Sequence, residues 1–420
     1  MKKTLILLVF ILLFSTYSFS YAGELSLSGE GAVLIDVDTM DILYEKNAHI
    51  KLYPASTTKI MTAILAIELG KMDDIVTIDQ EVVNLTDGTH IALEPGEQLT
   101  LEELLNALLI ESANDAALAI AKHVAGSIDG FSKLMNEKAK SIGALNTNFL
   151  NPNGLPDENH VTTPYDLGLM AKYAMENDIF RSIVNNYTYT IPVTNKKTEP
   201  RYLKSGNKLL YSTAKVDVDG VATPIKYDGV NGVKTGYTVA AQQCLVTSFE
   251  KDGHNLIAVV LKSNGNNIYS DIHKLLNYGV NNFEKVQVGF ANKFIDNFNV
   301  ENGLIPFVAG ITKTNSFYII NKNDNEKIVQ RIIIEEPLEA PISEDQVIGK
   351  VQYLLKDKVI AESHIISTME VNKITEPSLL EKLISKWYLI VFLMLILARI
   401  SVLSKRKKVR RRRRSSLYRA

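Results

Sequence analysis

The chain has strand-like segments at both ends of a helical middle. Gly31–Asp36 and Asp41–Tyr44 are apolar runs joined by a polar turn, which predicts an N-terminal β-hairpin. Three further strand-like runs follow much later, at Val230–Thr238, Gln243–Phe249 and Leu256–Lys262. Because each strand face must be buried against another layer, we expect an α+β domain in which strands from both ends form one antiparallel sheet flanked by helices.

The segment between these strands carries helix signals. Thr58–Leu69 has apolar residues at helical spacing. Thr100 and Glu103 form a capping-box pattern that opens a helix over Leu101–Ile110. The run of small residues Ala116–Ala125 predicts a closely packed core helix.

The two ends of the chain predict export and membrane anchoring. Residues 1–22 have the basic start, short apolar run and small-residue ending of a secretory signal peptide, with an uncleaved anchor helix as the alternative. Residues 384–403 are long and apolar enough for a transmembrane helix. The basic tail, residues 404–420, is then expected in the cytoplasm by the positive-inside rule, which leaves the intervening chain extracytoplasmic at the cell membrane.

The intervening chain divides by its sequence pattern. Residues 23–282 contain the strand and helix signals described above and form the larger predicted domain. Residues 283–372 are short alternating runs with few helical periods, which predicts a small all-β domain. Residues 373–383 would be the linker from this domain to the transmembrane helix.

Composition excludes some site types. The net charge of the whole chain is −1, but the C-terminal tail is strongly basic. A basic tail alone would also permit nucleic-acid binding. The apolar segment directly before it favours a membrane role, so we expect no nucleic-acid partner. The single cysteine, Cys244, excludes an intrachain disulfide and lies in an apolar run typical of a buried residue. The seven histidines lack metal-ligand spacing, so we expect no metal site.

Ser56 and Lys59 lie three residues apart at a predicted helix start, which brings a hydroxyl and an amine to one face. A lysine whose pKa is lowered by burial can accept the serine proton, and amides at a helix start can stabilise an oxyanion. The Ser-x-x-Lys pattern is weak alone. It also begins at Ser205, Ser212, Ser248 and Ser404, none of which opens a helix, and we interpret Ser205–Lys208 as a polar loop.

Two other short patterns could complete a cleft. Ser112-Ala113-Asn114 joins two predicted helices, although serine and asparagine are also ordinary N-cap residues. Lys234-Thr235-Gly236 lies on a predicted strand, where a cation and a hydroxyl could bind a carboxylate and glycine permits close approach. The alternative is an edge-strand lysine that prevents aggregation.

Together, Ser-x-x-Lys, Ser-x-Asn and Lys-Thr-Gly in this order are the signature of penicillin-interacting serine enzymes. Over roughly residues 25 to 280 the sequence resembles the low-molecular-mass penicillin-binding proteins that act as D-alanyl-D-alanine carboxypeptidases. The matching segments are Tyr53–Ala63, Asn114–Ala117, Asn151–Asp157 and Val233–Thr238. The chain departs from the family at Met40, where a glycine is frequent, and at Tyr237, where a histidine is frequent.

The resemblance implies a penicillin-binding catalytic fold and a serine-type carboxypeptidase without a cofactor. Ser56 would be the acyl-ester nucleophile, Lys59 the general base, and Ser112 the proton relay to the leaving amine. The expected substrate is a peptidoglycan stem pentapeptide, whose terminal D-alanine is removed, so that cross-linking in cell-wall biogenesis is limited. β-Lactams would acylate Ser56 and inhibit.

The resemblance also assigns the substrate-binding residues. Asn114 would hold the peptide backbone, and Lys234 with Thr235 would bind the terminal carboxylate; Gly236 would let the substrate backbone approach closely. The backbone amide of Tyr237 would complete the oxyanion hole.

Three alternative functions remain open. A class A β-lactamase shares the three patterns, but we find no glutamate-bearing loop between Ser112 and Lys234. A D,D-endopeptidase would differ only in its substrate. A catalytically silent cell-wall protein has no chemical reason to retain the full set of motif residues.

Overall fold

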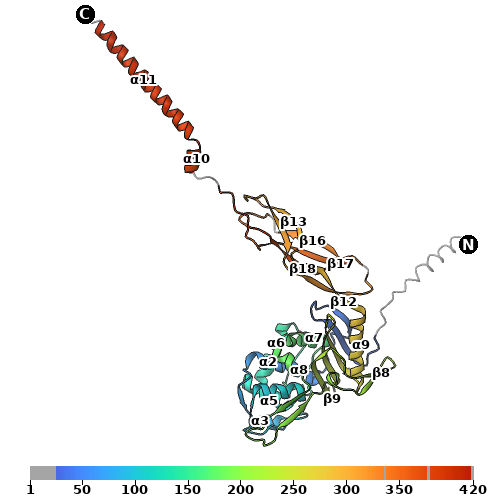
Figure 1. Ribbon diagram of the computed structural model, residues 1–420. Helices are drawn as coiled ribbons and strands as arrows, with labels where there is room; N and C mark the ends of the chain where they lie inside the picture. Colours follow the sequence, from blue (N-terminus) through green and yellow to red (C-terminus); the bar gives the residue numbers. More distant parts are fainter. Residues whose placement is uncertain (1–24, 325, 335–336, 376–378, 418–420) are drawn as a thin grey trace, which may run out of the picture. The chain divides into compact units, whose positions relative to one another are not determined.

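The computed structural model describes residues 25–324, 326–334, 337–375 and 379–417. These residues divide into two compact units (Figure 1). The first contains the chain up to Val286 together with Phe317–Glu326, and it is called the catalytic unit because it carries the predicted catalytic residues. The second contains Gln287–Ser316 and the chain from Lys327 onward. The predicted signal peptide, residues 1–22, lies outside the described residues.

The catalytic unit is built on a five-stranded sheet. Its strand order is β2-β1-β11-β10-β9, and every neighbouring pair is antiparallel. The strands are β1 (Gly31–Asp36), β2 (Ile42–Lys46), β9 (Val230–Thr238), β10 (Gln242–Lys251) and β11 (His254–Ser263). The predicted sheet from both parts of the chain is therefore confirmed, and β9 lies at its edge.

Helices cover both faces of this sheet. Val33 and Ile35 of β1 pack into the core beneath the larger helical layer, whereas Ala32 and Leu34 pack with α9 (Asn267–Asn282) on the other face. Burial on both faces explains why β1 is continuously apolar. The larger layer contains α2 (Lys59–Leu69), α4 (Leu101–Asn106), α5 (Asn114–Ala125), α6 (Ile128–Ile142), α7 (Pro164–Met175) and α8 (Asp178–Asn185).

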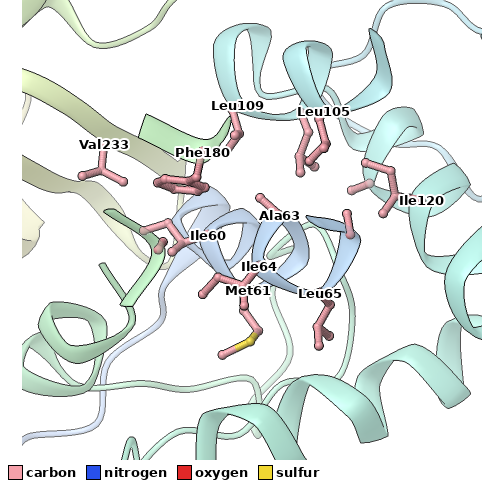
Figure 2. Close-up of a cluster of buried hydrophobic side chains, with 14 of the residues drawn as sticks. Ile60, Met61, Ala63, Ile64, Leu65, Leu105, Leu109, Ile120, Phe180 and Val233 are labelled. Atoms are coloured by element: carbon pink, nitrogen blue, oxygen red, sulfur yellow. The ribbon is translucent and has the colours of Figure 1, made fainter. Parts of the chain in front are cut away.

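Helix α2 lies at the centre of the larger layer. In Figure 2 its side chains lie among Leu105, Leu109, Ile120, Phe180 and Val233, which come from the neighbouring helices and from β9. The first eight residues of α2 are all buried, including its only lysine. The packing of α2 fixes the position of the turn that precedes it, so the core directly supports the site described below.

Short elements complete the catalytic unit. The predicted helix at 101–110 is α4 followed by a π-helical turn, η2 (Ala107–Glu111), and its capping box is present. Its other short elements include the helix α3 (Gln80–Leu85), the 3₁₀ turn η3 (Lys208–Leu210), and the strand pairs β3 (Ile75–Thr77) with β4 (Gln98–Thr100), β5 (Thr188–Ile191) with β6 (Arg201–Lys204) and β7 (Lys215–Val218) with β8 (Val221–Pro224). The paired strands β12 (Phe283–Gly289) and β15 (Ser316–Asn321) belong to it except for residues 287–289 and Ser316.

The second unit contains a small antiparallel sheet of order β13-β14-β18-β17-β16. Its strands are β13 (Phe294–Asn299), β14 (Phe307–Thr312), β16 (Val329–Ile334), β17 (Val347–Leu355) and β18 (Lys358–Ser367). Val308, Ile348, Val351, Tyr353 and Ile365 form the centre of its core. Short alternating runs in the sequence thus correspond to strands, as predicted.

The chain ends in two helices, α10 (Leu379–Ser385) and α11 (Trp387–Leu417). Within α11, Trp387–Arg411 is long and apolar enough to cross a membrane, with a mean hydropathy of 2.2 in its most apolar window. The predicted start of the span at Ile384 falls in α10, before the break at Lys386. Helix α11 also continues without interruption into the basic tail.

Candidate active site

Ser56 lies in a tight turn directly before α2. Residues Ala55–Thr58 form a 3₁₀ turn, η1, and Ala55 adopts a left-handed backbone with φ of 48°. The amide and hydroxyl of Thr57 both donate to the Pro54 carbonyl, at 3.2 and 2.7 Å, and this fixes the turn. Ser56 is half-buried, whereas Lys59, the first residue of α2, is completely buried. A reachable hydroxyl therefore lies beside a lysine enclosed by protein.

Three oxygen atoms surround the Lys59 amine. Its Nζ lies 2.9 Å from Ser56 Oγ, 2.6 Å from Asn114 Oδ1 and 2.7 Å from the Asn153 carbonyl oxygen. Burial lowers the pKa of Lys59 well below 10.5, the positive charge of Lys234 lowers it further, and the carboxylate of Asp115 opposes the change. The site therefore favours a neutral amine, which is the form that can accept a proton.

The turn containing Ser112 reaches the site through Asn114. Helix α4 and the π-helical turn η2 end at Ser112, whose backbone is left-handed with φ of 68°. Asn114 then begins α5. Its side-chain oxygen accepts a hydrogen bond from Lys59, and its backbone amide donates to the Thr89 carbonyl at 2.7 Å. The buried carboxylate of Asp115 accepts the amides of Ile91 and Leu93. These bonds hold the preceding loop against the turn.

Strand β9 also borders the site, next to the turn that carries Ser56. Lys234 is buried, and this lowers the pKa of its ammonium to about 7, opposed by the carboxylate of Glu111. A Cβ atom added to Gly236 would lie 3.0 Å from both the Pro54 carbonyl oxygen and the Ser56 amide nitrogen. The sheet-edge strand therefore passes directly over the turn that carries Ser56, and a side chain at position 236 would force the backbone of one of them to shift. Thr235 is half-buried and Tyr237 is exposed.

The segment around Asn153 contributes a residue that the sequence interpretation missed. Its functional atom is a backbone carbonyl, which no side-chain pattern identifies. The adjacent Gly154 has φ of +86°, and a Cβ added there would lie 1.9 Å from the Ala55 carbonyl oxygen. The Asn-Pro-Asn-Gly turn chemistry was the available sequence signal. The segment therefore packs against the turn Ala55–Thr58, which carries Ser56 and is called the nucleophile turn below.

Residues 19–265 match the family model described as D-alanyl-D-alanine carboxypeptidase, which covers more than half of the chain. The chain belongs to this family. Residues 283–373 match the penicillin-binding protein 5 C-terminal domain. The predicted catalytic fold followed by a small β domain is thereby confirmed, as is the prediction of a serine-type carboxypeptidase.

Known relatives of the carboxypeptidase match over most of their length. The Bacillus subtilis D-alanyl-D-alanine carboxypeptidase DacF is 32% identical over 92% of this chain and 98% of its own. The Escherichia coli D-alanyl-D-alanine carboxypeptidase DacC is 30% identical over 85% and 88%. The solved structure of penicillin binding protein 5 from Haemophilus influenzae aligns with a TM-score of 0.67 at 27% identity, covering 84% of this chain and 100% of that one.

The competing serine motif of the carboxypeptidase is a loop over Ser205–Asn207, and Lys208 begins the 3₁₀ turn η3; Gly206 and Lys208 are exposed. Ser205 and Asn207 are both buried, and the Ser205 hydroxyl accepts the Asn207 amide. A Cβ added to Gly206 would lie 3.0 Å from Thr235 Oγ1, so this loop borders β9. The prediction for Cys244 is confirmed: the thiol is buried, and burial raises its pKa to about 12.

Proposed function

We propose that this carboxypeptidase removes the terminal D-alanine from peptidoglycan stem pentapeptides through an acyl-enzyme on Ser56. The observation that carries the proposal is the set of partners around Lys59. A neutral amine has two N–H donors and one lone pair. Asn114 Oδ1 and the Asn153 carbonyl can accept the two N–H bonds, which leaves the lone pair for the Ser56 hydroxyl.

In the acylation step, Ser56 Oγ attacks the carbonyl carbon between the last two D-alanines while its proton passes to Lys59. The amides of Ser56 and Tyr237 stabilise the oxyanion, and the close passage of Gly236 over the turn supports this pairing. When the C–N bond breaks, Ser112 relays the proton from Lys59 to the leaving amine. The products of this half-reaction are free D-alanine and an ester on Ser56.

The substrate lies along the free edge of β9. An extended peptide can add to an unpaired sheet edge through backbone hydrogen bonds. Asn114 holds the peptide backbone from the opposite side. The ammonium of Lys234 and the hydroxyl of Thr235 bind the terminal carboxylate, which explains why a buried lysine is retained despite its lowered pKa.

Hydrolysis of the ester by water completes the cycle and needs no cofactor. β-Lactams, which resemble the terminal dipeptide, acylate the same serine and inhibit the enzyme. By trimming free pentapeptides, the activity limits cross-linking of the cell wall.

The proposed location follows from the sequence at the two ends. Residues 1–22 direct export, and residues 23–282 act outside the membrane as the catalytic domain. Residues 283–372 form the β domain, and residues 373–383 connect it to the anchor. Residues 384–403 form the membrane anchor, or the anchor begins at Trp387, where α11 begins. The tail, residues 404–420, lies in the cytoplasm.

Substitution of Ser56 tests the proposal. Ser56→Ala in the full-length protein should abolish both D-alanine release from a synthetic stem pentapeptide and labelling by a fluorescent penicillin. Ser212→Ala is the matched control, because Ser212 also begins a Ser-x-x-Lys pattern but opens no helix, and it should retain both activities. Labelling that survives Ser56→Ala would assign the nucleophile to another residue.

A further inference from the structure

The segment 150–160 supplies one of the three oxygen atoms around Lys59. Besides the Asn153 carbonyl at 2.7 Å from Lys59 Nζ, its Pro152 carbonyl accepts the Thr62 hydroxyl at 2.6 Å. Lys59 and Thr62 both belong to the first turn of α2. The orientation of the Lys59 amine therefore depends on how this segment is held against the helix.

His160 fastens the end of this segment to the nucleophile turn. The backbone amide of Leu150 donates to His160 Nδ1 at 3.0 Å, and His160 Nε2 lies 2.9 Å from Thr58 Oγ1. Because an amide can only donate, Nδ1 must be unprotonated, so the hydrogen of the neutral ring is on Nε2 and is donated to Thr58. Thr58 lies between Ser56 and Lys59 in the sequence and is completely buried.

The surroundings of His160 keep its ring in this single state. The side chain is 1% exposed and its ring contacts that of Phe149. Burial lowers the pKa of the imidazole to about 4, and the carboxylate of Asp157 opposes this. The ring is therefore neutral above about pH 4, and both of its nitrogens form hydrogen bonds. Nδ1 bonds to Leu150 at the start of the same segment, and Nε2 bonds to Thr58 in the turn.

We infer that His160 is a positioning residue for the proposed base, Lys59. By holding both Leu150 and Thr58, it closes segment 150–160 around the nucleophile turn and fixes the Asn153 carbonyl against the Lys59 amine. The role concerns the chemical step and not the binding of substrate, because His160 contacts none of the groups proposed to hold the peptide. The inference rests on the proposed function of Lys59.

Two substitutions of His160 separate its hydrogen bonds. Asparagine places an oxygen near the position of Nδ1 and keeps the acceptor for Leu150, but it lacks the link to Thr58. Glutamine places an amide nitrogen near the position of Nε2 and keeps the donor to Thr58. We expect His160→Asn to lower the rate constant of acylation by a penicillin about 10- to 100-fold with little change in binding, since small misplacements of a catalytic group have effects of this size. His160→Gln should stay closer to the wild type.

Two further variants keep the test decisive. Thr58→Val removes the same hydrogen bond from the other side with nearly the same shape, and it should reproduce the loss of His160→Asn. Asn136→Ala is the structural control. The Asn136 side chain hydrogen-bonds to the backbone amide and carbonyl of Phe149, the residue before segment 150–160, each at 2.8 Å, and it does not contact the nucleophile turn. It should lower the melting temperature while leaving acylation within about threefold of the wild type.

The measurements are the acylation rate constant, the binding constant for the penicillin and the melting temperature of the full-length protein. Wild-type acylation in His160→Asn or Thr58→Val would overturn the inference, as would equal losses in His160→Asn and His160→Gln. Labelling of Ser56→Ala would instead refute the proposed function itself. An inactive Ser56→Ala together with a fully active His160→Asn would refute only the role of His160.

Discussion

Replacing Lys234 with methionine should stabilise the catalytic unit while removing its activity. Lys234 is 2% exposed, and burial lowers the pKa of its ammonium from 10.5 to about 7. Methionine has an unbranched side chain of similar length and no charge to desolvate. Glu111, which faces Lys234, is only half-buried and also accepts the amide of Lys204, so its carboxylate keeps a partner after the substitution.

The magnitude follows from the change in pKa. At about 1.36 kcal/mol per pH unit, the fall from 10.5 to about 7 corresponds to about 5 kcal/mol lost on burying the charged lysine. Between these two values the unfolded chain binds the proton and the folded chain does not, so wild-type stability rises with pH across the window. We expect Lys234→Met to be more stable by about 4 kcal/mol at pH 7, where the folded lysine is half protonated, and equal to the wild type near pH 10.5.

Calorimetry of the full-length protein in detergent measures this difference. The only tryptophan, Trp387, lies in α11, so its fluorescence does not report on the catalytic unit. An increase in melting temperature on the order of 10 °C is expected at pH 7. Lys234→Arg, which retains a buried charge, should show no such increase. A Lys234→Met variant that melts at or below the wild type at pH 7, or a difference that does not shrink as the pH rises, would refute the reasoning.

Three other perturbations test the geometry of the site and the anchor. Gly236→Ala should lower the rate of labelling by fluorescent penicillin about 10²-fold, because its Cβ would lie 3.0 Å from the Ser56 amide nitrogen; unchanged labelling would show that β9 can move aside. As the pH rises, kcat/KM should increase as Lys59 loses its proton and decrease above about pH 7 as Lys234 loses its proton. A profile without the decrease at higher pH would contradict the carboxylate-binding role proposed for Lys234. Removal of residues 387–420 should release the protein from vesicles in a flotation assay, and retention would place the anchor elsewhere.

The sheet could be predicted because its strands carry local signals. Continuous apolar runs such as Gly31–Asp36 are typical of strands covered on both faces, and β1 has this environment. The order of the strands has no such local signal. The pairing of β1 with β11, which leaves β9 at the edge, is set by packing between segments more than two hundred residues apart, as the register of Gly31 opposite Leu261 shows. Helices α6, α7 and α8 were not predicted, although Ser127 and Thr163 are N-caps of two of them.

The candidate site could be predicted where its chemistry belongs to side chains. Ser56, Lys59 and Asn114 meet within hydrogen-bond distance, as their motifs indicated. The Asn153 carbonyl could not be predicted, because every residue carries a carbonyl and only the fold decides where it points. The left-handed backbone of Ser112 could not be predicted either. Serine rarely adopts this conformation, so the surrounding structure must impose it.

These side-chain and backbone contributions depend on one another through charge. Lys59 and Lys234 are both buried in the site, and burial lowers the pKa of each. The positive charge of Lys234 adds to the effect of burial on the pKa of Lys59. Asn114 and Asn153 offer Lys59 neutral oxygen atoms and no carboxylate, so they orient the amine without restoring its proton. A carboxylate in either position would favour the ammonium form of Lys59 and remove the lone pair that the proposed mechanism needs. The proposed chemistry therefore requires acceptors without charge around Lys59, and the Asn153 backbone carbonyl and the Asn114 side-chain oxygen both meet this requirement.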